Sequence, residues 1–218
     1  MLGATEIGFT GGQCVARIAE GRVAAEPTSP DQRARQLRIL RAAEQLGSEC
    51  ALDQVQMHEV AKRAGVAVGT LYRYFPSKTH LFVGVMAYQI DRLVQALAAR
   101  APDSDLPVEN VFDVLARANR AVLRRPLLAT AMMQSAGAAN PETVTDVARI
   151  DETMRSVLLR EAGIENPTAN DLAIVRVLLQ AWAGILQSSL TGRLSLADAE
   201  TDLHLACRIM IAGTSATS

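Results

Sequence analysis

The sequence has little of several features that mark other classes of protein. Its three cysteines, Cys14, Cys50 and Cys207, are odd in number and far apart, so neither a disulfide framework nor a zinc site is expected. Aromatic residues make up only 4% of the chain, and the alternating β-branched runs that predict strands are missing. The N-terminus has no basic flank followed by an apolar run, and no stretch of about 18 apolar residues occurs. We therefore expect a cytoplasmic protein with no membrane span.

The net charge is also small, at -1 at pH 7, so the charge of the whole chain does not predict binding to a polyanion. The charges are unevenly distributed, however. Residues 31–80 hold eight basic and five acidic residues, whereas residues 81–218 hold twelve and fifteen. An excess of three basic residues also occurs in segments without any function. Here it favours binding to an anionic partner only because the basic segment coincides with the motif described below.

Helix-forming residues are abundant. Ala and Leu dominate a hydrophobic fraction of 49%, and these residues lose little side-chain freedom in a helix. Apolar residues recur at helical spacing between clear start and stop signals, such as the capping hydroxyl, proline and acid of Ser29-Pro30-Asp31. About nine helices and no strand are predicted, over 29–47, 55–64, 68–74, 77–99, 106–124, 127–138, 140–161, 168–190 and 195–212. The predicted fold class is all-α.

Residues 55–75 predict two short helices joined by a tight turn, which is the geometry of a helix-turn-helix. Gly65 ends the first helix, because glycine accepts the left-handed backbone that a sharp turn often needs. Val66 is the apolar residue of the turn. Leu71 and Phe75 are expected in the core of this pair.

The second short helix carries residues that suit a DNA surface. Gly69 permits close approach, and Thr70 offers a hydroxyl to phosphate and a methyl to thymine. Tyr72 and Tyr74 have hydroxyls that reach phosphate oxygens, and Lys78 stands at the start of the following helix, where backbone N–H groups also favour an anion. Two of these residues also have an explanation that does not involve DNA. Tyr72 could pack against the first helix, and Lys78 could be an ordinary lysine on the surface.

At this point a resemblance is clear. Residues 56–81, with the core AGVAVGTLYRYFPSK, resemble the DNA-binding domain of the TetR family of bacterial repressors. The resemblance implies a homodimer that reads an inverted repeat in operator DNA, and C-terminal helices that enclose a pocket for a small molecule. It also implies that ligand binding moves the helix over 77–99 and spoils the spacing of the two half-sites. The expected organisation is a flexible arm over 1–28, a DNA-binding domain over 29–80, a ligand-binding and dimerisation domain over 81–213, and a disordered tail over 214–218.

The resemblance also carries over DNA-contacting positions, one by one. They are Gln56, His58, Val68, Gly69, Thr70, Tyr72, Tyr74 and Lys78. His58 departs from the arginine that some members place there, although an imidazole still donates to guanine or phosphate. Val68 offers only apolar contact to a base, so direct sequence reading by this helix is expected to be modest.

Within that family, the segment VGTLYRYFPSKTHL is similar to a narrower group, the actinobacterial repressors of steroid and cholesterol catabolism. This similarity implies an apolar effector such as a steroid or an acyl-CoA thioester. Three helices of the C-terminal half supply a methionine-rich set of candidate lining residues, which suits a bulky apolar ligand. The candidates are Phe112, Leu115, Met132, Met133, Leu179, Trp182 and Leu186. The alternative for each of them is an ordinary place in the core.

Other classes of function have less support. His58, His80 and His204 lie in different parts of the chain and form no catalytic or metal-ligand pattern, and neither a P-loop nor GxGxxG occurs. No catalytic residue, cofactor or metal is therefore expected. A second interpretation is a DNA-binding regulator whose C-terminal half binds a protein partner in place of a small ligand. The apolar helices over 168–190 and 195–212 must bury a second face, which a dimer interface would supply.

Overall fold

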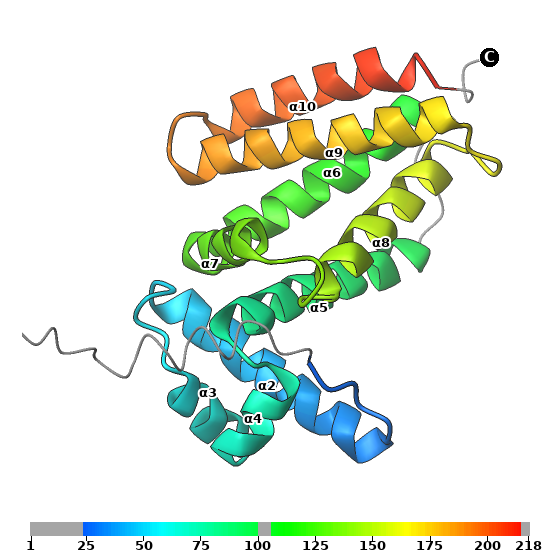
Figure 1. Cartoon of the computed structure of the whole chain (residues 1–218). Coiled ribbons are helices and arrows are strands. Elements are labelled where there is room, and N and C mark those ends of the chain that lie inside the picture. Colours follow the sequence, from blue (N-terminus) through cyan, green and yellow to red (C-terminus); the bar gives the residue numbers. More distant parts are fainter. Residues whose placement is uncertain (1–23, 100–105, 215–218) are drawn as a thin grey trace, which may run out of the picture.

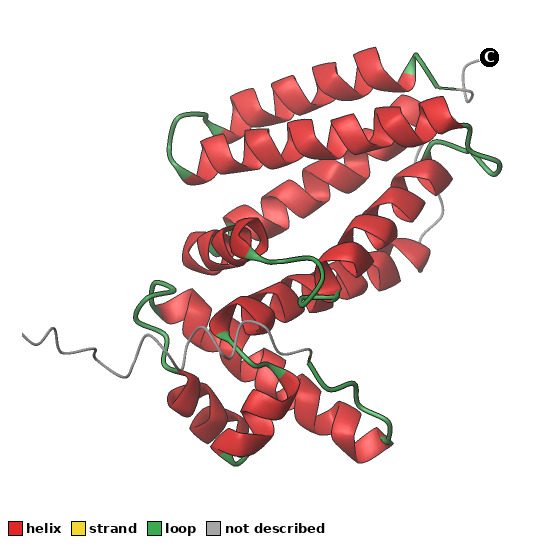
Figure 2. Cartoon of the chain, in the orientation of Figure 1, coloured by secondary structure: helices red, strands yellow, loops and turns green. Residues whose placement is uncertain are grey.

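The computed structural model describes residues 24–99 and 106–214, and within these ranges it contains nine helices and no strand (Figure 2). This confirms the predicted all-α fold class. The helices are α2 (Pro30–Glu49), α3 (Met57–Ala64), α4 (Val68–Tyr74), α5 (Lys78–Ala98), α6 (Pro107–Leu123), α7 (Pro126–Ala138), α8 (Asp146–Glu161), α9 (Ala169–Leu190) and α10 (Leu196–Ile211).

Capping side chains are present at four of the nine helix starts in the described residues. The hydroxyls of Ser29, Ser77 and Ser195 accept hydrogen bonds from backbone N–H groups in the first turns of α2, α5 and α10. Thr168 forms a reciprocal capping box with Asp171 at the start of α9. These side chains satisfy donors that would otherwise have no partner within the helix.

One predicted helix begins later than expected. The sequence predicts a helix over 140–161, but α8 starts at Asp146. The Asn140 side chain accepts a hydrogen bond from the N–H of Glu142 at 2.9 Å, and the Asn140 carbonyl accepts one from Val144 at 2.9 Å. Asn140 therefore closes a local turn and does not cap the helix, which is a common alternative role of asparagine.

Two groups of helices lie one above the other (Figure 1). The lower group is α2, α3 and α4, and the upper group contains α6, α8 and the antiparallel pair α9 and α10, with α5 and α7 between the groups. Each group has its own core of buried apolar residues. Met86 of α5 packs against both cores, so α5 links the two groups physically.

The crossing of α2 and α5 depends on two glycines. A Cβ at Gly47 would lie 2.6 Å from Cε1 of Phe82, and one at Gly84 would lie 2.8 Å from Cε1 of Phe75. Because real Cβ contacts are almost never shorter than 3.0 Å, only glycine permits this close approach. These two positions fix how the lower helices attach to α5.

The chain ends differ in part from the expectation of a flexible arm and a disordered tail. Residues 24–28 follow the lower helices, and the N–H of Ala25 donates to the carbonyl of Arg73 at 3.0 Å. Thr214 is 2% exposed. Residues 1–23 and 215–218, which make up the rest of the expected arm and tail, lie outside the described residues.

In the described part of the chain, α5 and α9 are long and apolar enough to cross a membrane by length and composition alone. Neither is an unbroken apolar run, which is why the sequence does not predict a span. Both pack within the helical bundle: α5 contacts α2, α7 and α8, and α9 contacts α10.

Candidate DNA-binding surface and effector cavity

The α3–α4 pair is a helix-turn-helix held by a small apolar core. Gly65 has a φ of 64° and ends α3, and the N–H of Val66 donates to the carbonyl of Ala61 at 3.0 Å. Leu71 and Phe75 are buried, as the sequence predicts. The turn and the core together fix the orientation of α4 relative to α3.

The outer side of this pair displays most of the predicted DNA-contacting residues. Five of them are exposed and Thr70 is half-buried; the exposed five are Gln56, His58, Val68, Gly69 and Tyr72. Val68 and Tyr72 are both 43% exposed. A Cβ at Gly69 would meet no atom within 4 Å, so nothing inside the chain requires glycine there. All six positions are thus accessible to solvent at least in part, on α3, on α4 or, for Gln56, directly before α3.

Tyr74 is the exception, and its predicted phosphate contact needs correction. This side chain is 2% exposed and belongs to the core of the lower helices. It shares the wall of a hollow with residues 24–27, and the N–H of Ala25 in that segment donates to the carbonyl of Arg73 on α4. Tyr74 and Tyr72 are two residues apart, which places them about 200° apart around a helix, so one faces inward when the other faces outward.

Lys78 is half-buried and already has protein partners. Its ammonium group donates to the carbonyl oxygens of Leu52 and Asp53, at 3.1 Å each. Lys78 therefore ties the loop before α3 to the start of α5. An ammonium group has three donors, so one remains for an outside acceptor.

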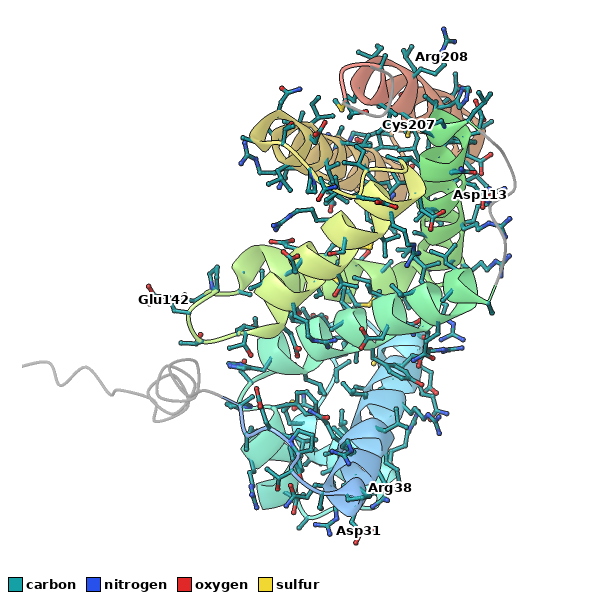
Figure 3. The ribbon with its side chains drawn as sticks, turned by 90° about the vertical axis from the view of Figure 1, so that its right-hand side faces the viewer. Asp31, Arg38, Asp113, Glu142, Cys207 and Arg208 are labelled. Atoms are coloured by element: carbon teal, nitrogen blue, oxygen red, sulfur yellow. The ribbon has the colours of Figure 1, made fainter. Side chains whose placement is uncertain are left out.

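Arginines on α2 extend the positive charge beyond the helix-turn-helix. Arg33, Arg35, Arg38 and Arg41 are all exposed on this helix. Nε of Arg38 donates to the carbonyl of Ala64, at 3.3 Å, just before the turn between α3 and α4. Arg38 lies at the lower end of the molecule, whereas Arg208 of α10 lies at the opposite end (Figure 3).

A cavity of about 290 Å³ lies where the two cores meet. Its wall contains Leu128 and Met132 from the lower core, and Met154, Trp182 and Leu186 from the upper one. Of the seven predicted lining residues, four are in this wall: Met132, Met133, Trp182 and Leu186.

The other three predicted lining residues do not line this cavity. Leu115 is completely buried in the upper core. Phe112 packs edge-on against the ring of His204, with ring centroids 4.7 Å apart. Leu179 packs against the upper core. The contacts of these three residues are those of the packing around α6 and α9.

Polar groups also lie in the cavity wall, and of the residues that carry them the sequence predicts only Trp182. Nε1 of Trp182 is buried and has no hydrogen-bond partner within the described residues. The Glu44 carboxylate of α2 forms ion pairs with Arg125 and with Arg92, the latter at 4.0 Å. Arg124 also lines the cavity. Sequence spacing gives no signal for this cluster, since its members come from α2, from α5 and from the junction of α6 and α7.

Exposed apolar side chains are frequent on α9 and α10. Nine large hydrophobic side chains are exposed in the described residues, and five of them lie on these two helices: Leu172, Val177, Leu196, Leu205 and Ile209. The inner face of α9 is occupied by the core residues Val175, Leu178, Trp182 and Leu186. The two helices thus carry exposed apolar side chains in addition to those that face the core.

The titratable residues of the described chain form no cluster that could hold a metal, since no group of three or more His, Cys, Asp or Glu side chains comes together there. His58 lies on α3 and His80 in the first turn of α5. Nε2 of His204 lies 3.0 Å from a carboxylate oxygen of Glu109, and the ring packs against Phe112. The three histidines therefore remain in separate environments.

Comparison with known proteins assigns both halves of the chain. Residues 39–85 match the family described as "Bacterial regulatory proteins, tetR family", and residues 104–210 match "Tetracyclin repressor-like, C-terminal domain". The chain is 35% identical to the HTH-type transcriptional repressor KstR of Mycobacterium tuberculosis (strain ATCC 25618 / H37Rv) over 197 residues. That alignment covers 90% of this chain and 88% of that protein.

Solved structures agree with this assignment. A TetR transcriptional regulator from Rhodococcus sp. RHA1 superimposes with a TM-score of 0.78 and 52% identity, covering 83% of this chain and 97% of that one. FadR from Bacillus subtilis, in complex with stearoyl-CoA, has the same fold, with a TM-score of 0.59 and 16% identity over 81% of this chain and 98% of that one. The chain therefore belongs to the TetR family of DNA-binding transcription regulators, and its relatives over most of its length are transcriptional repressors.

Proposed function

We propose that this protein is a cytoplasmic repressor that binds an inverted-repeat operator as a homodimer and is released by an apolar small molecule. The observation that carries the proposal is the accessible set on α3 and α4, where Val68 and Tyr72 are exposed and Gly69 has open space. An α-helix fits the major groove, and exposed residues at the start of a recognition helix are those that reach base edges.

Within that surface, we assign different roles to different residues. Gln56, Thr70 and Tyr72 hold the phosphate backbone through side-chain oxygens and amides. His58, Val68 and Gly69 face the bases. Lys78 adds positive charge while it ties the α2–α3 loop, so we assign it both roles. Tyr74 takes no part in DNA contact, because it is buried.

Dimerisation in this proposal uses the outer face of α9 and α10. Exposed apolar side chains concentrated on two adjacent helices are typical of a protein interface. A two-fold interface pairs each residue with a counterpart on the partner, which sets the two helix-turn-helix units at a fixed spacing. The lower helices would then form the DNA-binding domain, over about 29–80, and residues 81–213 the domain that binds effector and partner.

The effector we propose is a steroid or an acyl-CoA thioester. Four methionines, Met86, Met132, Met133 and Met154, line the cavity and provide a wall that adapts to the shape of an apolar ligand. Nε1 of Trp182, which has no partner within the described residues, can donate a hydrogen bond to a keto or hydroxyl oxygen of the ligand. The cavity of about 290 Å³ is at the lower end of ligand pockets, so a large ligand must move its walls. In the FadR structure, a protein of the same fold binds stearoyl-CoA.

The operator is the first thing to test. Fragments of the DNA upstream of the protein's own gene are labelled, and binding is followed by fluorescence anisotropy and footprinting. We expect a protected inverted repeat, a stoichiometry of two chains, and an affinity that falls steeply with salt because phosphate contacts release counterions. Equal affinity for all fragments and for random DNA would contradict the proposal of a specific operator.

Release is tested next, with steroids and acyl-CoA thioesters added to the operator complex. A cognate ligand raises the thermal midpoint of the free protein by linkage and lowers operator affinity. If no compound does so and a stoichiometric protein copurifies on the C-terminal half, the regulator with a protein partner is the correct interpretation. Copurification of a second copy of this chain does not favour that interpretation.

A further inference from the structure

Glu44 is a buried carboxylate that connects the DNA-binding half to the cavity. Its side chain is 10% exposed and lies on α2, within the lower group of helices. Its two cationic partners come from elsewhere: Arg92 from α5 and Arg125 from the residue before α7. Glu44, Arg92, Arg124 and Arg125, which we call the Glu44 cluster, all line the cavity.

The Glu44 cluster has more positive than negative charge. Three guanidinium groups and one carboxylate line the same wall; Arg92 and Arg125 pair with Glu44, and Arg124 has no ion pair within the described residues. The side chains of Arg92 and Arg125 are about half exposed, at 56% and 54%, so both can turn toward a ligand. A wall with this excess of arginine attracts an anion and presents planar donors that match a carboxylate or a phosphate.

We propose that the arginines of the Glu44 cluster bind an anionic group on the effector. This binding breaks their ion pairs with Glu44 and thereby weakens the attachment of α2 to α5 and to the α6–α7 junction. This inference rests on the proposed function, since it names the chemistry and the switch of the same cavity. The ligand class is an apolar body with one acidic group, either a free carboxylate or the phosphates of a coenzyme A thioester. The methionine wall holds the body, and Arg92, Arg124 and Arg125 hold the anion.

The physical basis of the switch is competition for the same donors. With the cavity empty, Arg125 and Arg92 balance the charge of Glu44 and hold α2 against α5 and the α6–α7 junction. When an anion takes these guanidinium groups, the Glu44 carboxylate loses its partners inside the protein, which is unfavourable for a buried charge. Movement of α2 toward water relieves that cost, and α2 packs directly on α3. Because coupling is reciprocal, operator DNA must weaken binding of the anion by the same factor.

The test uses ligands that differ only in the head group. Decanoic acid, decanoyl-CoA and 1-decanol form one series, and cholanic acid, its coenzyme A thioester and cholan-24-ol form another with a steroid body. Binding to the full-length protein is measured by calorimetry, and operator release by anisotropy. We expect at least one acid or thioester to bind about tenfold or more tightly than the matched alcohol. We also expect that this anionic ligand releases the DNA and that the alcohol does not.

The series also identifies the source of the anion. Preference for the free acid assigns a carboxylate, and preference for the thioester assigns coenzyme A phosphates; either result supports the inference. Equal binding and equal release by acid, thioester and alcohol overturn it. Absence of binding by all six ligands overturns it too.

Three variants separate anion binding from the switch. R124Q removes a cation that does not hold Glu44, so we expect weaker anion binding, by about tenfold, with unchanged operator affinity in the absence of ligand. E44Q removes the competitor, so we expect tighter anion binding together with a smaller effect of the anion on operator affinity. R155Q is the control, because Arg155 pairs with Glu152 on α8 and is not part of the cavity wall.

Unchanged coupling in E44Q, with folding verified by circular dichroism, contradicts the switch even if the anion binds. The proposed function fails differently, since it requires specific operator binding by the unliganded protein, which is measured before any ligand is added. A protein that binds its operator and is released by apolar alcohols would keep the proposed function and lose this inference.

Discussion

Tyr72 and Tyr74 are two residues apart in α4, yet their side chains have different surroundings. Tyr72 is 43% exposed, whereas Tyr74 is buried in the core of the lower helices. If the Tyr72 hydroxyl donates to a phosphate, Y72F should weaken operator binding by about 0.5–1.5 kcal/mol, which is roughly two- to twelvefold. The loss should be equal for specific and random DNA, because a phosphate contact carries no sequence information.

Y74F is the matched control for that measurement. The substitution removes the same atom from the buried tyrosine, so operator affinity should change by less than about twofold. Anisotropy titrations of both variants at one salt concentration decide the matter. A larger loss in Y74F than in Y72F would reverse our assignment of the two side chains.

Gly69 has open space around it, which makes it a direct probe of DNA approach. G69A adds a methyl group that meets nothing in the free protein, and alanine is a better helix former by up to about 1 kcal/mol. We expect unchanged or raised thermal stability and operator binding weakened by about tenfold. G137A in α7 is the control, because a Cβ there also meets nothing within 4 Å and lies outside the DNA-binding surface. Equal operator affinity in G69A and wild type would show that DNA does not approach this position closely.

Cys207 of α10 is completely buried, and this burial, together with the charge of Glu109, raises the pKa of its thiol from 9.0 to about 12. The unfolded chain therefore loses this proton at lower pH than the folded chain does. Stability is retained below pH 9 and falls as the pH rises from 9 toward 12, by up to about 1.4 kcal/mol per pH unit. Denaturant unfolding of wild type and C207A between pH 8 and 10.5 tests this, since the variant should show a flatter slope. Parallel slopes would contradict it.

At the scale of elements, the contact between α2 and α5 decides how the DNA-binding half is attached. Gly84 leaves no room for a side chain, because a Cβ would lie 2.8 Å from Phe75 and 3.3 Å from Leu40. G84A should therefore force the helices apart and lower the free energy of unfolding by about 1–3 kcal/mol. Chemical denaturation measures this loss, with G137A again as control. A gain in stability, as helix propensity alone would give, would show that the crossing relaxes without cost.

Helix positions follow closely from local signals, as the α9 and α10 starts illustrate. Thr168 and Ser195 cap these helices through contacts within four residues, so no distant part of the chain is needed to define them. The turn at Asn140 is different. Asparagine before proline suits both a helix cap and a closed turn, and the structure has the turn, which delays α8 until Asp146.

At the scale of the whole molecule, the outer face of α9 and α10 is the proposed dimer interface. Ile209 is 66% exposed there. A two-fold interface would contain Ile209 twice, so I209D should weaken self-association on the order of a hundredfold, since burial of one isoleucine contributes about 1.5–3 kcal/mol. Analytical ultracentrifugation measures the association, and operator affinity should fall with it. L127D, which changes an exposed apolar residue of α7, is the control. A dimer that survives I209D unchanged would place the interface elsewhere.

The sequence by itself determined the helices, the helix-turn-helix and the family. These depend on local chemistry: caps such as Ser77, the left-handed Gly65, and the ordered residues from Ala64 to Lys78. It also separated core from surface for Leu71 and Phe75, because apolar periodicity within one helix reports which side faces the protein. Four of the seven proposed lining residues were found in the same way.

Only the tertiary structure decided the direction of the remaining side chains. Tyr74 is buried because it packs in the core formed by the lower helices together with α5 and α7. Lys78 is tied to Leu52 and Asp53 by a loop that periodicity does not describe. Leu115 and Met132 are both apolar, yet only Met132 lines the cavity, because that depends on how the six helices around it pack together. The Glu44 cluster joins residues that are up to 81 positions apart, and only the packing of α2 against the α6–α7 junction brings their charges together.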